Sequence, residues 1–251
     1  MTGARIGSRS QRTLLIAVTV IGTMLGFACL DRPTVKPDRG NAPGATAVSF
    51  RTSDGVMLNA RLWARDPRRI VIYLHEYRGN QTTWWPTAEE GGATDPSALT
   101  LDFRGHGTSE GSADDVTAMP QDALAALAFA QERGYQRIVI VGAGMGAAAG
   151  IVAAVDDSAI GVLGLSAPSE FADIDAVGAI HHLEQRVALL ASEGDLSARQ
   201  SIHDFRLHAA IPSARIVMLK GIDHGETLLT GERRREATAA FRRLLAELWR
   251  P

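Results

Sequence analysis

The sequence contains a single cysteine, Cys29, among 251 residues. A lone cysteine excludes an intrachain disulfide, so packing of the core must stabilise the fold. The sequence also lacks an internal repeat, and no change of composition inside its main body indicates a second domain. Its length and its 45% content of hydrophobic residues are sufficient for one sizeable α/β core. We therefore expect one globular domain.

A strong excess of charge is also missing. The formal net charge is −2 at pH 7, which is close to balance for a chain of this size. Proteins that bind nucleic acid or acidic surfaces usually carry a clear excess of basic residues. The composition therefore argues against nucleic acid as a partner.

The N-terminus has the composition of an export segment. Arg5, Arg9 and Arg12 precede the apolar run TLLIAVTVIGTMLGFA, which ends at Cys29. This pattern resembles a bacterial lipoprotein signal peptide, in which the cysteine is lipidated and becomes the mature N-terminus, although Gly26 stands where an aliphatic residue is usual. The alternative is an uncleaved membrane anchor over residues 1–28. Both predict an exported domain whose only contact with the membrane is this anchor.

Residues 29–46 predict a flexible tether, because they contain three prolines and two glycines without apolar periodicity. After it, AVSFRT and VMLNARLWA flank the turn residues Ser53, Asp54 and Gly55, which predicts an antiparallel hairpin. We expect the folded domain to cover residues 47–251.

From residue 69 onward, short apolar runs alternate with helical stretches. Continuous apolar runs of this length are typical of parallel strands that are covered on both faces. The expected strands are residues 69–74, 98–103, 137–142, 160–165, 187–192 and 215–220, and the expected helices are residues 121–133, 145–155, 198–208 and 232–249. Together with the hairpin, the pattern predicts an α/β fold with an eight-stranded, mostly parallel sheet flanked by helices.

The stretch IVIVGAGMGAAAG has two interpretations. Gly142, Gly144 and Ala147 fit the G-x-G-x-x-G/A loop that binds a dinucleotide. The same residues also fit the G-x-S-x-G turn of an α/β-hydrolase, with Gly144 where the nucleophilic serine belongs. A dinucleotide fold usually begins with this strand and ends the next strand with an acidic residue. Here several strands come first and the next strand ends at Leu165, so dinucleotide binding is the minor alternative.

Four other segments favour the hydrolase interpretation. LHEYRGN, LDFRGHGTSEG, LLASEGD and LKGIDHGETLL each follow or end a predicted strand, in the order expected for that fold. With them, residues 47–249 resemble the α/β-hydrolase superfamily of serine esterases and acyl hydrolases, although Glu76 in LHEYRGN stands where glycine is usual. Only about 20 residues separate the strand that ends at Leu165 from the one that begins at Val187, so we expect no cap domain.

The resemblance implies the roles of five positions. Gly144 takes the nucleophile position, Asp195 the acid position and His224 the position of the general base, while the backbone amides of Tyr77 and Met145 would face the oxyanion. Glycine adopts the positive φ of this turn at little cost, but it supplies no hydroxyl. The resemblance therefore implies a hydrolase fold without its nucleophile.

We expect such a protein to be catalytically impaired and to bind a small acyl-type ligand or a protein partner. The alternative is an active hydrolase in which His224 activates a water molecule. Neither function requires a cofactor or a metal.

Several other residues have more than one interpretation. Glu193 is the second candidate for the acid. His75 and His106 belong to motifs that more often hold loops, so we expect structural roles for them. Trp84 and Trp85 either line a pocket or cover the core. His181, His182 and Glu184 lack the spacing of a metal site and predict a solvated helix face.

Overall fold

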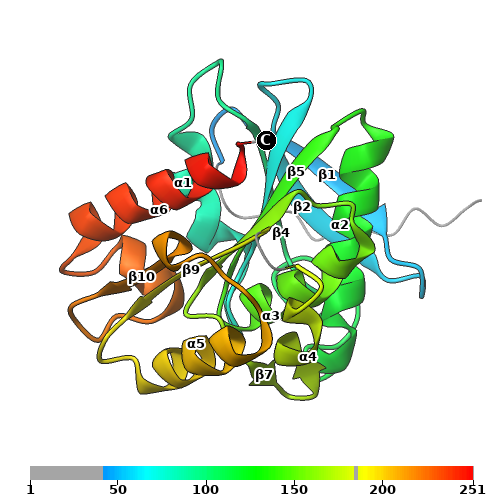
Figure 1. Cartoon of the computed structure of the whole chain (residues 1–251). Coiled ribbons are helices and arrows are strands. Elements are labelled where there is room, and N and C mark those ends of the chain that lie inside the picture. Colours follow the sequence, from blue (N-terminus) through cyan, green and yellow to red (C-terminus); the bar gives the residue numbers. More distant parts are fainter. Residues whose placement is uncertain (1–41, 184–185, 251) are drawn as a thin grey trace, which may run out of the picture. The chain divides into compact units, whose positions relative to one another are not determined.

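The computed structural model describes residues 42–183 and 186–250 (Figure 1). The predicted export segment, Cys29 and most of the predicted tether lie outside the described residues. The described residues all belong to one compact unit, Lys36–Pro251. Within the described ranges, no helix is long and apolar enough to cross a bilayer.

The centre of the domain is an eight-stranded sheet in the order β1-β2-β4-β3-β5-β6-β9-β10. Only β1 and β2 pair in antiparallel fashion with their neighbours, and the other pairs are parallel. The strands are β1 (Thr46–Arg51), β2 (Met57–Trp63), β3 (Arg69–Leu74), β4 (Ser97–Leu101), β5 (Arg137–Ala143), β6 (Gly161–Leu165), β9 (Val187–Ser192) and β10 (Ile216–Leu219). The predicted sheet is confirmed.

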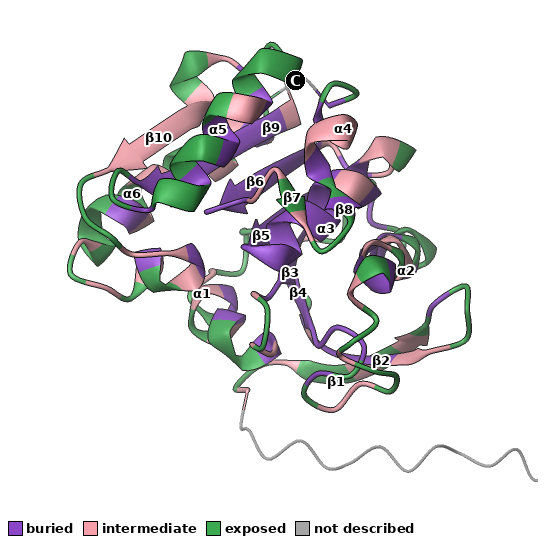
Figure 2. Ribbon diagram, turned by 90° about the horizontal axis from the view of Figure 1, so that it is seen from below, coloured by how far each residue is buried: buried purple, intermediate pink, exposed green. Residues whose placement is uncertain are grey.

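Helices cover both faces of this sheet, as Figure 1 shows. One face carries α2 (Met119–Glu132), α3 (Met145–Ala153), α4 (Ala176–Ile180) and α5 (Leu196–His208). The other face carries α1 (Trp85–Glu89) and α6 (Arg234–Leu248). The central strands are therefore buried on both sides (Figure 2), which explains why their sequences are continuously apolar.

The short elements escaped the sequence prediction, because a segment of two to five residues shows no periodicity. They include α1, α4 and the small hairpin of β7 (Glu170–Phe171) and β8 (Ile174–Asp175). The 3-10 helices are η1 (Gln81–Trp84), η2 (Val116–Ala118), η3 (Ala154–Asp156), η5 (Ser213–Arg215) and η6 (Gly225–Leu229). Between β6 and β9 the described residues form only β7, β8 and α4, so no cap domain covers the strand ends.

The loop after β4 is held by a buried ionic cluster. The Arg104 side chain is 1% exposed and forms ion pairs with the fully buried Asp122 and with the more exposed Asp54 and Asp115, all at 2.7 to 2.9 Å. Asp102, in the same loop, accepts hydrogen bonds from the backbone and the side chain of Gln81. The D-x-R-G-x-G-x-S segment is therefore a structural brace of the domain.

Candidate functional site

The glycine turn lies between β5 and α3. Gly144 has φ of 48° and ψ of −120° and occupies the N-cap position of α3. A residue with a side chain rarely adopts a positive φ, so glycine relieves strain at this turn. Met145 is the first residue of α3 and is buried, whereas Tyr77 is 39% exposed in the loop after β3. Both residues thus belong to segments that follow neighbouring strands, β5 and β3.

Asp195 and His224 meet at the same edge of the sheet. The distance between Asp195 Oδ2 and His224 Nδ1 is 2.6 Å. The other carboxylate oxygen, Oδ1, accepts a hydrogen bond from the amide of Ala198 and so caps α5. Asp195 therefore has two roles: it caps α5 and it orients the ring of His224. Glu193 is exposed in the preceding turn and is not a partner of His224 in the described structure.

A second carboxylate, Glu76, contacts the other ring nitrogen of His224. The distance between Glu76 Oε1 and His224 Nε2 is 3.1 Å. In serine hydrolases this nitrogen receives the proton of the nucleophile. A Cβ atom added to Gly144 would lie 2.9 Å from Glu76 Cγ and 3.4 Å from Oε1. The Glu76 side chain therefore fills the space into which a serine at position 144 would project.

Gly225 provides the opposite wall for the Glu76 side chain. It also has a positive φ, of 55°, and an added Cβ would lie 2.2 Å from Glu76 Oε2. A residue larger than glycine at position 225 would therefore displace the Glu76 carboxyl group. Gly144 and Gly225 thus form the cradle in which the glutamate lies.

Two further contacts fix the backbone of Glu76. The buried His75 donates from Nδ1 to the carbonyl of Glu76 at 2.8 Å and accepts at Nε2 from the amide of Phe103. Burial lowers the pKa of His75 to about 3, so its ring is neutral and this pattern of donor and acceptor holds. The amide of Glu76 donates to Glu226 Oε1, which also accepts from the Thr83 hydroxyl. Hydrogen bonds to its carbonyl and its amide therefore hold the backbone of Glu76 in one position.

The two carboxylates change the charge of His224. The hydrogen bond that His224 donates to Glu76 is the largest cause, and together with the smaller contribution of Asp195 it outweighs the effect of burial. The pKa of His224 is therefore raised to about 9. The imidazole is consequently a cation near neutral pH, and a cation cannot accept a proton.

Glu226, which holds the backbone of Glu76, also has a shifted pKa. Burial, together with the nearby charge of Glu76, raises the pKa of Glu226 to about 7, although its two hydrogen bonds act in the other direction. The folded chain therefore holds this proton more tightly than the unfolded chain, whose glutamate titrates near 4.5. As a result, this group makes the free energy of unfolding fall as the pH rises from about 4.5 to about 7.

We expect the Glu226→Gln variant to remove that fall. Glutamine keeps the acceptor for the Glu76 amide and Thr83 but cannot ionise, so the variant should gain about 2 kcal/mol at pH 8 and little at pH 4.5. Urea unfolding between pH 4 and pH 8.5 measures this difference. Glu193→Gln, at an exposed carboxylate, is the control. Equal pH slopes for the wild type and Glu226→Gln would contradict the assignment.

The remaining candidates lie apart from this cluster. His106 Nδ1 contacts the carbonyl of Arg104, which is a structural role, as is that of His75. His181 and His182 are exposed in the turn that follows α4, with tilted rings whose centroids are 3.7 Å apart, so the predicted helix face is wrong because the helix ends at Ile180. Glu184 lies outside the described residues. Within the described ranges, no group of three or more His, Cys, Asp or Glu residues could hold a metal.

The fold and the strand order define an α/β-hydrolase-fold protein, and Gly144 lies in its turn between β5 and α3. Solved structures of esterases and other α/β-hydrolases share this architecture. An α/β-hydrolase from Novosphingobium aromaticivorans has 17% identity and a TM-score of 0.65, with 83% of this chain and 100% of the other covered. The dinucleotide alternative is not supported by this fold.

Two further structures are similar over most of their length. DcsB, determined in complex with its substrate analogue, has 14% identity and a TM-score of 0.69 and covers 81% of this chain and 98% of its own. Est1E from Butyrivibrio proteoclasticus, with bound ferulic acid, has 16% identity and a TM-score of 0.60, with 81% of this chain and 100% of the other covered. No family model and no curated protein matches the sequence.

Proposed function

We propose that this protein is a membrane-tethered, exported α/β-hydrolase-fold protein that has lost acyl-enzyme chemistry and binds its target without cleaving it. The target is a small acyl-type compound or a protein partner. The observation that carries the proposal is the contact of Glu76 Oε1 with His224 Nε2 beside Gly144. No cofactor or metal takes part in this proposal.

The loss of the serine hydroxyl alone has a large effect. Removal of the nucleophile in a working triad lowers turnover by about 10⁶ and leaves only the contributions of binding and the oxyanion hole. Glu76 adds a second obstacle, because it occupies the nitrogen that would otherwise accept a proton from serine or from water. The geometry therefore also argues against the alternative in which His224 activates a water molecule.

A site of this kind still presents recognition groups to a ligand. Within residues 42–183 and 186–250 no cap covers the strand ends, and the side chains of His224 and Glu76 are 41% and 28% exposed. Both ring nitrogens of His224 already contact carboxylates, so the group left to meet a bound molecule is the Glu76 carboxyl group, whose oxygens can each accept more than one hydrogen bond. In this proposal Glu76 contacts the ligand through hydrogen bonds, and neither Glu76 nor His224 forms a covalent bond with it.

Hydrolysis of 4-nitrophenyl acetate and butyrate by residues 36–251 tests the proposal. We expect the wild type, His224→Ala and Glu76→Gln to show the same low rate, within about twofold, because none has a working nucleophile. A wild-type rate that falls at least tenfold in His224→Ala would overturn the proposal in favour of histidine-activated water. A comparable fall in Glu76→Gln alone would instead assign the catalytic step to the glutamate carboxylate.

A further inference from the structure

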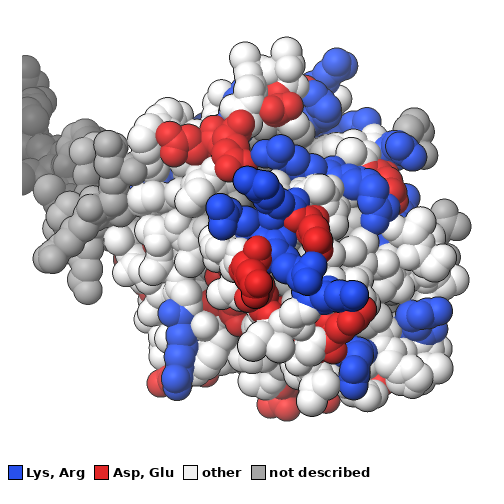
Figure 3. Space-filling view, turned by 90° about the vertical axis from the view of Figure 1, so that its left-hand side faces the viewer, with Lys and Arg blue, Asp and Glu red and all other residues white. Residues whose placement is uncertain are grey.

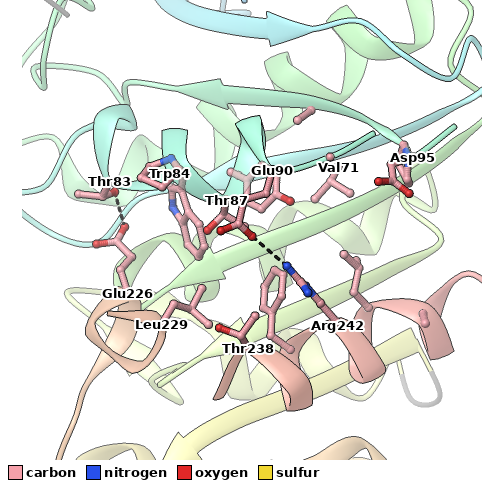
Figure 4. A pocket seen from close by; sticks show the side chains of 18 of the residues that line it. Val71, Thr83, Trp84, Thr87, Glu90, Asp95, Glu226, Leu229, Thr238 and Arg242 are labelled. Carbon is pink, nitrogen blue, oxygen red and sulfur yellow. Dashed lines mark hydrogen bonds and ion pairs between the residues drawn. The ribbon is translucent and has the colours of Figure 1, made fainter. Parts of the chain in front are cut away.

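A cavity of about 820 Å³ lies between α1 and α6, and Glu226 is one of the residues that line it (Figure 4). Its floor is formed by residues of β3 and β4, and its walls by η1, α1, η6 and α6. The size is within the range of small-molecule sites. Its apolar lining includes Val71, Tyr73, Trp84, Phe241, Leu245 and Trp249.

The cavity follows from the lengths of the two helices that form its walls. α1 has 5 residues and α6 has 15, so α1 covers less of the sheet face than its partner. Two polar contacts join the walls: Glu90 with Arg242 at 3.0 Å, and Thr83 with Glu226 at 2.9 Å (Figure 4). The space between the helices is therefore bridged at two places and not closed by apolar packing.

Two polar groups of the lining lack partners. Trp84 is fully buried, and its indole Nε1 has no hydrogen-bond partner among the described residues. Tyr73 is 5% exposed as a whole residue, and its hydroxyl forms no hydrogen bond within the described part of the chain. The two rings are neighbours, with centroids 5.2 Å apart. A buried donor without an acceptor destabilises the fold, and a ligand with a suitable oxygen would satisfy it.

The charges around the cavity are already engaged. Arg65 donates to the carbonyl of Ala88, Arg69 pairs with Asp66, and Arg242 pairs with Glu90. Figure 3, which shows the face at the left of Figure 1, has basic and acidic side chains interspersed on it. Of the three arginines in the described lining, Arg69 and Arg242 are therefore paired with carboxylates, and Arg65 is held by backbone carbonyls.

We propose that this cavity binds a neutral, mainly apolar small molecule with a carbonyl or ether oxygen that accepts hydrogen bonds from Trp84 Nε1 and the Tyr73 hydroxyl. The cavity is separate from the cluster of Glu76, Asp195 and His224. Glu226 lies between the two, since it lines the cavity and also receives the amide of Glu76. The ligand is thus recognised by shape and by two neutral donors.

The uncharged fluorophore Prodan, an aminonaphthalene ketone, tests the proposal on residues 36–251. We expect saturable binding at one site with a blue-shifted emission. Thr238 of α6 lines the cavity, whereas its neighbour Ala239 is exposed and does not. Thr238→Phe should weaken Prodan binding at least tenfold because it fills the space, and Ala239→Phe should leave it unchanged. Absence of saturable binding, or equal affinities of Thr238→Phe and the wild type, would overturn the proposal.

A second pair of measurements isolates the hydrogen bonds. Tyr73→Phe removes only one oxygen, so it should weaken Prodan by about 2- to 10-fold. It should not weaken N-phenyl-1-naphthylamine, which is apolar and has no carbonyl. Equal effects on both probes would contradict recognition of an oxygen. His224→Ala should leave both affinities unchanged, so this test is independent of the proposed loss of acyl chemistry.

Discussion

The double variant Glu76→Gly/Gly144→Ser should hydrolyse 4-nitrophenyl butyrate at least about 10³-fold faster than the wild type. Serine supplies the missing hydroxyl, and glycine at position 76 is the residue usual in the family at that point of the loop. Removal of the carboxylate also removes the main cause of the raised pKa of His224, so the imidazole can be neutral at pH 7 and accept the proton. Asp195 is already in place to orient the ring.

The two single variants are the controls for this result. Gly144→Ser alone should remain inactive, because the new Cβ would lie 2.9 Å from Glu76 Cγ and His224 Nε2 already contacts Glu76. Glu76→Gly alone lacks a nucleophile. Labelling by a fluorophosphonate should follow the same order and appear only in the double variant. A folded double variant that neither turns over ester nor reacts with the probe would show that the site lacks more than the hydroxyl.

The Arg104→Leu variant should lose about 3 to 5 kcal/mol of the free energy of unfolding. The substitution leaves the carboxylate of Asp122 fully buried without its cation. Asp54 and Asp115, by contrast, are 41% and 50% exposed and can return to water. Urea unfolding of the folded fraction, or the loss of soluble protein when the variant does not fold, measures the effect.

Two companion variants separate the buried pair from the exposed ones. Arg104→Leu/Asp122→Asn should recover at least half of the loss, because the unpaired charge is gone. Asp115→Asn should cost less than about 1 kcal/mol, as exposed ion pairs do. If Asp115→Asn were as harmful as Arg104→Leu, the cluster would not owe its effect to burial.

The sheet could be predicted from the sequence because its strands are nearly continuous apolar runs. The predicted ranges 69–74 and 137–142 match β3 (Arg69–Leu74) and most of β5 (Arg137–Ala143). Such runs are typical of strands covered on both faces, and the structure buries them in this way. The five-residue helices α1 and α4 are too short for helical periodicity, so the cavity that α1 leaves open was also beyond prediction.

The contact between Glu76 and His224 was missed for a different reason. The sequence shows both exchanges, a glutamate where glycine is usual and a glycine where serine is usual. Nothing in the local sequence connects them. Glu76 belongs to the loop after β3, whereas Glu226 lies in η6 and His224 directly precedes that element. Glu76 and Glu226 are 150 positions apart. Two exchanged residues in loops that follow neighbouring strands are the signal that could have indicated the pair.

Trp84 shows that two interpretations of one residue can both be correct. Its ring is fully buried within the apolar layer beneath α6, and it also lines the cavity. The sequence offered no way to choose between core and pocket, because an aromatic side chain serves either purpose.

Asp195 would persist in a lineage that no longer performs any reaction. Its replacement by alanine would cost α5 its N-terminal cap, about 0.5 to 2 kcal/mol of stability, whatever happens at His224. Selection for folding therefore preserves this acid after selection for turnover has ended. The presence of an aspartate at this position is therefore weak evidence for turnover, because its role as the cap of α5 is sufficient to explain it.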